Sequence, residues 1–168
     1  MDGVTLKVIR YDHWLSHEPE HFDRIVISPG PGHASDYPGL MQTILHQGKQ
    51  IPLLGICLGM QCVGLAFGAE LANLGSVWHG QTKTTLINKA HFLWKDVPDF
   101  FQTGHYHSWV ISGHHFPDDL EILATESETG AIMAVAHRKF PIVGVQFHPE
   151  SVMTNEGFKI IANFIRNQ

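Results

Sequence analysis

Residues 51–61, IPLLGICLGMQ, decide the fold, because an apolar run leads through Gly55, Cys57 and Gly59 directly into a helix-forming stretch. This pattern is typical of a strand that turns sharply into a helix and lifts the middle residue of G-x-C-x-G clear of the sheet. We expect Cys57 at the helix N-terminus, where the positive end of the helix dipole favours thiolate over thiol. The alternative is a small buried hydrophobic residue, the usual role of a free cysteine.

Strand-like and helical segments alternate on both sides of this turn, which predicts a parallel sheet with helices on its faces. The strand-like runs are LKVIRY (6–11), DRIVIS (23–28), IPLLGI (51–56) and PIVGVQF (141–147). Residues 37–47 are helical, and a second helix closes the chain. Thr154 or Asn155 would cap this last helix, and its apolar stripe is Phe158, Ile161, Phe164 and Ile165. Residues 76–137 instead contain TKTTLI, SWVIS, LEILAT and AIMAVAH with little helix between them.

Together these segments predict an α/β fold with a mostly parallel central sheet, flanking helices and a small antiparallel extension. A length of 168 residues with 43% apolar side chains fits one compact domain over residues 1–168.

A second reactive pair follows the last predicted strand, in the sequence GVQFHPES. His148 and Glu150 are two residues apart, so in an extended segment they point to the same side, and the carboxylate can accept from one imidazole nitrogen while the other faces a thiol. The alternative is a solvated surface turn. Because ligands bind beyond the carboxyl ends of parallel strands, we expect this pair to meet Cys57 in one site.

The loop SPGPGHAS follows the strand at 23–28 and places Gly30 and Gly32 where backbone N–H groups can face an oxygen. An oxyanion hole is the functional interpretation, and an ordinary turn is the alternative. The loop lacks the Lys and the Ser or Thr of a phosphate-binding P-loop.

Composition excludes several classes of partner. The net charge of −5 gives no basic surface for nucleic acid, and no apolar run is long enough to span a membrane, so we expect a cytoplasmic protein.

Cys57 and Cys62 lie on one predicted helix with diverging side chains, so no disulfide is expected. The 13 histidines raise the alternative of a metal site, but solvated histidines are the better explanation, and we expect no metal.

The motifs PGPG, GICLGMQ and GVQFHPES, with GHYHSW at 104–109, occur in the order found in the class I (triad) glutamine amidotransferases, which this chain resembles from Asp23 onward. The tail resembles that of the small glutaminase subunits of anthranilate and aminodeoxychorismate synthases. The resemblance implies that Cys57 is the nucleophile, His148 the acid and base, and Glu150 its orienting partner. It further implies that L-glutamine is held by Gly30, Pro31, Gly32, Leu58, Gln61, Ser108 and Trp109, with the N–H groups of Leu58 and Gly32 forming the oxyanion hole.

The resemblance also implies a reaction without a cofactor, in which a thioester on Cys57 releases ammonia to a chorismate-using synthase subunit. Trp109 replaces the more common leucine, His105 stands where arginine is frequent, and Met60 stands where histidine is frequent. Alternatives are an amidotransferase module for GMP, CTP or carbamoyl phosphate synthesis, a γ-glutamyl hydrolase, or an inactive docking subunit.

Members of this family usually open with a strand and a helix that carry an Asp-Asn-Tyr-Asp-Ser-Phe-like motif, and no such motif precedes residues 6–11 here. The resemblance therefore implies that the first strand-helix unit is missing. Removing a central strand would leave unpaired backbone groups and an uncovered apolar face. We therefore expect the chain alone to be poorly stable and weakly active.

Overall fold

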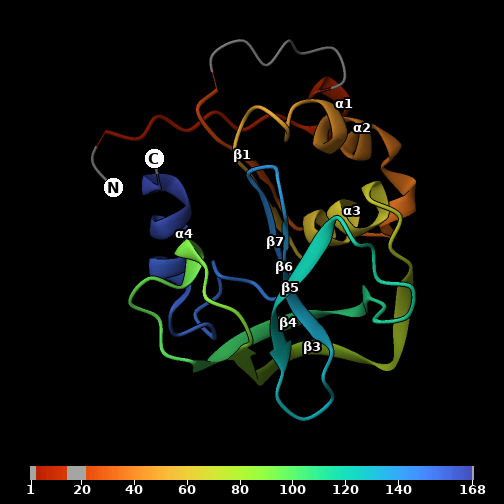
Figure 1. Cartoon of the computed structure of the whole chain (residues 1–168), viewed down its shortest axis with the longest axis vertical. Helices are drawn as coiled ribbons and strands as arrows, with labels where there is room; N and C mark the ends of the chain where they lie inside the picture. Colours follow the sequence, from red (N-terminus) through yellow and green to blue (C-terminus); the bar gives the residue numbers. More distant parts are fainter. Residues whose placement is uncertain (1–2, 15–21, 168) are drawn as a thin grey trace.

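The structure, a computed structural model, describes residues 3–14 and 22–167. Among these residues the strands form one seven-stranded sheet in the order β1-β2-β7-β6-β5-β3-β4 (Figure 1). The strands are β1 (Ile25–Ile27), β2 (Leu53–Ile56), β3 (Leu71–Ile87), β4 (Phe100–Ile111), β5 (Leu120–Glu126), β6 (Ile132–His137) and β7 (Ile142–Val145). The helices are α1 (Tyr11–Trp14), α2 (Pro38–His46), α3 (Leu58–Ala66) and α4 (Gly157–Arg166), with short 3-10 helices η1 (Ala34–Asp36) and η2 (Phe92–Trp94).

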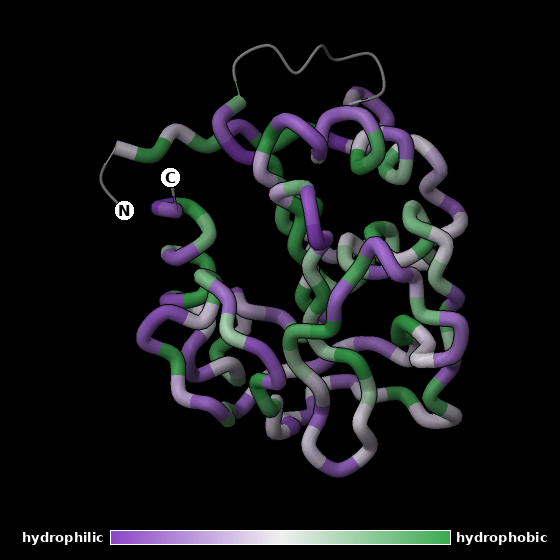
Figure 2. Tube along the Cα trace, viewed as in Figure 1, coloured by the Kyte–Doolittle hydropathy of each residue, from purple (hydrophilic) through white to green (hydrophobic). Residues whose placement is uncertain are grey.

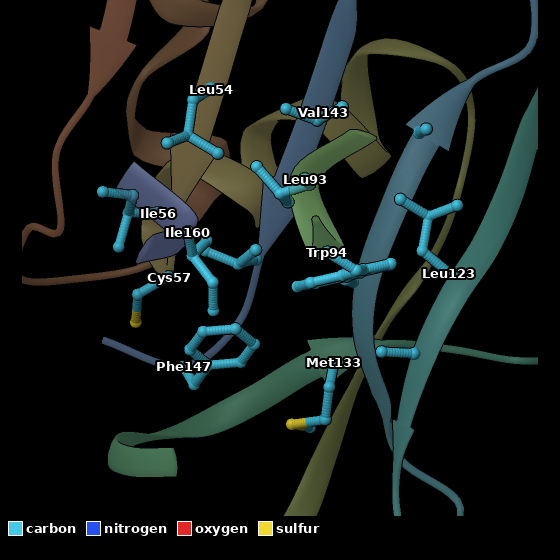
Figure 3. Packing of buried hydrophobic residues seen from close by; sticks show 14 of the residues in the cluster. Leu54, Ile56, Cys57, Leu93, Trp94, Leu123, Met133, Val143, Phe147 and Ile160 are labelled. Carbon is cyan, nitrogen blue, oxygen red and sulfur yellow. The ribbon is translucent and has the colours of Figure 1, made fainter. Parts of the chain in front are cut away.

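The parallel part of the sheet, β1-β2-β7, is covered by helices on both faces. Every residue of β2 and of β7 is buried, as continuous apolar strands require. Because side chains alternate along a strand, Leu53 packs with residues of α2 and α3, whereas Leu54 packs with Ile160 of α4. Figure 3 shows the second of these cores, and Figure 2 shows hydrophobic residues gathered along the strands.

The antiparallel part is larger than the small extension expected from the sequence. Of the six strand pairings among the described residues, β1–β2 and β2–β7 are parallel, and the other four are antiparallel. The long strand β3 accounts for this, because it pairs with β4 along most of its length and with β5 near its end, with register shifts between Asn73 and Trp78 and between His79 and Gln81. The α/β class itself, with a parallel part flanked by helices, is confirmed.

Three local predictions differ from the structure. Residues 6–10 form no strand, and Tyr11 begins the short helix α1. Glu156, rather than Thr154 or Asn155, is the N-cap of α4, and its side chain makes no capping hydrogen bond. Phe158 on α4 is 69% exposed, so the buried stripe of that helix runs through Ile160 and Phe164 instead.

The gap inside the sheet that the missing central strand predicts is not found among the described strands, because β1, β2 and β7 pair continuously. β1 is an edge strand, since no described strand pairs with its outer side. A groove of about 340 Å³ runs between residues 7–11 and β1, with Ile9, Tyr11 and Ile25 among its walls. Val26 on this edge is 49% exposed, and Leu6 and Val8 of the facing segment are more than 80% exposed. In the part of the chain that is described, no helix is long and apolar enough to cross a membrane.

Gly55 allows β2 and α3 to meet, so Gly55→Ala should lower the free energy of unfolding by about 1–3 kcal/mol or more. A Cβ at this position would lie 2.5 Å from the backbone carbon and oxygen of Gly59, and neither atom can move without shifting the helix. Chemical denaturation followed by circular dichroism measures the loss. Gly113→Ala is the matched control, because a Cβ there meets nothing within 4 Å. Equal stability of the two variants would contradict the prediction.

Candidate active site

Cys57 lies immediately after β2 and is the N-cap residue of α3, as the sequence predicts. Its backbone has φ 52° and ψ −104°, a conformation that L-residues rarely adopt and that costs of order 1–3 kcal/mol. The cost is tolerated because the surroundings fix the turn: a Cβ on Gly59 would lie 2.5 Å from the carbonyl oxygen of Ile27. A cysteine that served only to fill the core would not need this strained turn.

Cys57 is 6% exposed and lies beside Ile56 and near Phe147 in the core (Figure 3). Its backbone N–H donates to the carbonyl oxygen of Val145 at 2.8 Å, which extends the β2–β7 ladder to the end of both strands. The residues that follow β7 are therefore held next to Cys57. This is the meeting of two strand ends that the sequence predicts.

His148 and Glu150 form the predicted pair after β7, with His148 Nδ1 2.7 Å from Glu150 Oε1. The backbone of His148 is fixed on both sides: its N–H donates to the carbonyl oxygen of Gly104 at 3.0 Å, and its carbonyl accepts from the Thr154 hydroxyl at 2.6 Å. The ring of Tyr106 packs edge-on against the imidazole at 4.9 Å. These contacts hold one orientation of the histidine.

The second imidazole nitrogen of His148, Nε2, is buried and makes no aligned hydrogen bond to a described residue. Burial opposes a charge on this ring, but the interactions with Cys57 and Glu150 outweigh it and raise the pKa of His148 to about 9. Burial alone would likewise raise the pKa of Glu150, but the bond from His148 lowers it. The site therefore favours a protonated imidazole between the sulfur of Cys57 and the carboxylate of Glu150.

The PGPG loop follows β1 and packs on the start of α3. A Cβ on Gly30 would lie 2.9 Å from the Leu58 side chain, and Gly32 has φ 81°, which favours glycine. Leu58 is the first residue of α3, so its N–H has no acceptor within the helix. The Pro31 carbonyl accepts from the hydroxyl of Tyr37 at 2.8 Å, which steadies the loop.

Gln61, Ser108 and Trp109 come from two elements, α3 and β4. Gln61 is buried, and its Nε2 donates to the carbonyl oxygen of Trp109 at 2.9 Å. The ring of Trp109 meets the ring of His33 edge-on at 4.8 Å, which connects β4 with the PGPG loop. Ser108 is half-buried one residue earlier on β4. These contacts join Gln61 of α3 to Trp109 of β4, and Trp109 to the residue that follows the PGPG loop.

Comparison with known proteins decides the family. Residues 2–168 match the family described as Glutamine amidotransferase class-I. The chain belongs to this family. This amidotransferase is 42% identical over 170 residues to the anthranilate synthase beta subunit 1 of rice. The match covers 98% of this chain and 59% of the rice protein.

Two further proteins are similar to this amidotransferase. It is 41% identical to anthranilate synthase component 2 of Saccharolobus solfataricus, over 85% of this chain and 75% of that one. Among solved structures, a protein described as a candidate GMP synthase component, from Thermoplasma acidophilum, superposes with a TM-score of 0.81 at 26% identity, covering 95% of this chain and 78% of that chain.

The sequence did not reveal several residues of the amidotransferase that support the site. Thr154, predicted as a helix cap, instead joins His148 to β4, since it also accepts from the N–H of Gly104 at 3.0 Å. Gln146 is fully buried and donates through Nε2 to Cys57 Sγ at 3.6 Å. One signal could have identified Gln146: it is a polar residue in an apolar strand end, two positions before His148.

The expectation of solvated histidines is wrong for His105 and His107, which are 0% and 6% exposed. Both hydrogen-bond to each other and to neighbouring groups on β4, so burial is compensated. Burial lowers the pKa of His105 to about 3 and that of His107 to about 4, and both rings are neutral. No group of three or more His, Cys, Asp or Glu within residues 3–14 and 22–167 is placed to hold a metal ion.

The raised pKa of His148 should be visible as a titration with a midpoint near pH 9 in NMR spectra of the folded protein. Because the folded pKa lies above the ordinary 6.5, the resulting stability is fully present below about pH 6.5 and is lost as the pH rises through about 9. Cys57→Ala removes the sulfur that interacts with the ring and should lower the midpoint, whereas Cys62→Ala should leave it in place. A midpoint unaffected by Cys57→Ala would show that the thiol does not interact with the ring.

Proposed function

We propose that this chain is a glutaminase that hydrolyses L-glutamine to glutamate and ammonia and delivers the ammonia to a chorismate-using synthase subunit. One observation carries the proposal: a cysteine held in a strained turn at a helix N-terminus lies beside a histidine whose other ring nitrogen is bonded to a glutamate. Triads of this kind activate a nucleophile for acyl transfer.

In the first step, Cys57 Sγ attacks the γ-carboxamide carbon of glutamine and forms the carbon–sulfur bond. The carbon–nitrogen bond breaks, and the amine takes a proton from His148 Nε2 and leaves as ammonia. A pKa near 9 supports this role, because the imidazole then carries its proton at neutral pH. The oxyanion that forms in between is bound by the backbone N–H groups of Leu58 and Gly32.

In the second step, water attacks the γ-glutamyl thioester. His148 accepts the proton of this water, and Cys57 leaves as thiolate with release of glutamate. Glu150 remains bonded to Nδ1 throughout, which keeps Nε2 directed at the reacting atoms and stabilises the imidazolium. No cofactor is required for either half of the cycle.

The substrate lies against the PGPG loop and the end of β4. Gly30, Pro31 and Gly32 border the acyl group, and Gln61, Ser108 and Trp109 hold the rest of glutamine. The contact between the rings of His33 and Trp109 supports this arrangement, because it joins the two sides of the proposed pocket.

The proposed partner is a synthase subunit that uses chorismate, and the relatives that support it are named as a beta subunit and as component 2 of anthranilate synthase. Anthranilate synthesis for tryptophan is the main interpretation, and aminodeoxychorismate synthesis for folate is the variant. Both would take place in the cytoplasm. A module for GMP synthesis is the second candidate, because of the structural similarity to the Thermoplasma protein. Co-purification with a chorismate-using subunit or with a GMP-synthesising one separates the two.

Cys57→Ser should reduce glutaminase activity by about 10⁴-fold or more, because the nucleophile is lost. Synthesis by the partner from added ammonia should be unchanged, since only the nitrogen source is removed. The control is Cys62→Ala, at a buried cysteine on the same helix whose pKa is raised to about 12 by burial. It should lose some stability and keep its turnover. Glutaminase activity that persisted in Cys57→Ser would refute the assignment.

Glu150→Gln should slow turnover less than His148→Ala does. The turnover that remains should be roughly 10- to 100-fold higher in Glu150→Gln than in His148→Ala. The reason is that an imidazole without its carboxylate can still transfer protons, although it is poorly aligned. Steady-state rates with glutamine give the ranking. If Glu150→Gln were as inactive as Cys57→Ser with its fold intact, the carboxylate would do more than orient the ring.

A further inference from the structure

A chain of buried polar groups runs from β4 to the sulfur of Cys57. On β4, Thr103 Oγ1 lies 2.8 Å from His105 Nε2, His105 Nδ1 lies 2.9 Å from His107 Nε2, and His107 Nδ1 lies 3.1 Å from the carbonyl oxygen of Trp109. From that carbonyl the chain continues through side-chain amides. Its second half is Trp109 O to Gln61 Nε2 at 2.9 Å, Gln61 Nε2 to Gln146 Oε1 at 3.3 Å, and Gln146 Nε2 to Cys57 Sγ at 3.6 Å.

The carbonyl of Trp109 fixes the direction of the histidine half of this chain. A carbonyl oxygen only accepts, so His107 must donate from Nδ1, and its neutral ring then accepts at Nε2. His105 must therefore donate from Nδ1 to His107, and its Nε2 is an acceptor that lies beside the hydroxyl of Thr103; this hydroxyl also lies 3.1 Å from the carbonyl oxygen of Lys83, to which it can donate. The opposite set of tautomers would place two acceptors, His107 Nδ1 and the Trp109 oxygen, against each other.

The same carbonyl fixes the direction of the amide half. Gln61 must present its NH₂ group to the Trp109 oxygen, and this NH₂ group also reaches Gln146 Oε1. Gln146 therefore presents its oxygen to Gln61 and its NH₂ group to Cys57. A flipped Gln146 amide would put NH₂ against NH₂ at one end and oxygen against sulfur at the other. In the native network, only the donor end of Gln146 can face the sulfur.

We propose that Gln146 is a catalytic residue that donates a hydrogen bond to the Cys57 thiolate and raises the fraction of thiolate before glutamine binds. The inference rests on the proposed function of Cys57 as nucleophile. Gln146 is 0% exposed, so its bond to the sulfur does not compete with water. A bond to a charged acceptor is stronger than one to a neutral acceptor, and the donor therefore favours thiolate over thiol.

Gln61 acts as a positioning residue in this arrangement, because it holds the oxygen of Gln146 and leaves only the NH₂ group for the sulfur. The pair of buried neutral histidines serves the same end at a greater distance, by holding the Trp109 carbonyl that orients Gln61. Two residues on either side of His148 in the sequence thus support different groups. Glu150 orients the imidazole of His148, and Gln146 stabilises the thiolate of Cys57.

The test is the pH profile of alkylation of Cys57 by iodoacetamide, measured on the chain without glutamine and resolved from Cys62 by mass spectrometry. Gln146→Met keeps the length of the side chain but removes the donor. We expect roughly tenfold slower alkylation at neutral pH and a profile displaced to higher pH. Gln146→Glu, which places oxygens against the sulfur, should slow the reaction further. Gln102→Met is the matched control on the exposed face of β4 and should behave as the unmodified chain does.

Unchanged alkylation profiles in Gln146→Met and Gln146→Glu, with native circular dichroism, would overturn the proposal. If Gln146→Met fails to fold, Gln61→Met decides: release of the Gln146 amide should displace the profile in the same direction by a smaller amount, and an unchanged profile would count against the proposal. The reaction with iodoacetamide needs neither glutamine nor a partner. Absence of glutaminase activity in the unmodified chain would therefore defeat the proposed function and leave this measurement intact.

Discussion

The close approach of β2 to the start of α3 is the constraint on which the rest of the structure depends. Cys57 adopts φ 52° only because Gly55 and Gly59 let the backbone pass within distances that a Cβ would forbid. The same approach sets α3 against β1, since Gly59 packs on the carbonyl of Ile27. Moving this turn would shift the Cys57 side chain, the first N–H groups of the helix and the PGPG loop together. The strained backbone conformation of Cys57 is thus held by the contacts among β1, β2 and α3.

The histidine side of the site depends on a similar contact. Gly157, the first residue of α4, lies so close to Pro149 that a Cβ would be 1.9 Å from its carbonyl oxygen. Beyond this contact, α4 buries Ile160 and Phe164 in the core. Burial of these side chains stabilises the fold. Because Gly157 contacts Pro149, it also holds the turn that carries His148 next to β4. The residues that give stability therefore also position His148.

The sequence predicts what is local and leaves open what depends on distant partners. The turn at Cys57 and the pairing of His148 with Glu150 follow from spacing over a few residues, and both are confirmed. The apolar pattern of residues 6–11 predicts a strand, but a strand also needs hydrogen bonds to a neighbour, and a groove separates residues 7–11 from the free edge of β1. The burial of His105 and His107 could not be predicted, because it arises where β3 brings Trp78 over both rings.

Three histidines lie close together in this site, and their surroundings give them different charge states at neutral pH. His105 and His107 are buried with only neutral hydrogen-bond partners, and the nearby charge of His148 disfavours a second proton. His148 has a carboxylate on one side and a thiol that can ionise on the other, which stabilise its proton. Neighbouring titratable groups can take different acid–base roles when different environments move their pKa values apart. The ring that carries an extra proton at neutral pH is therefore the one beside the sulfur of Cys57, while the neutral pair orients the amides behind it.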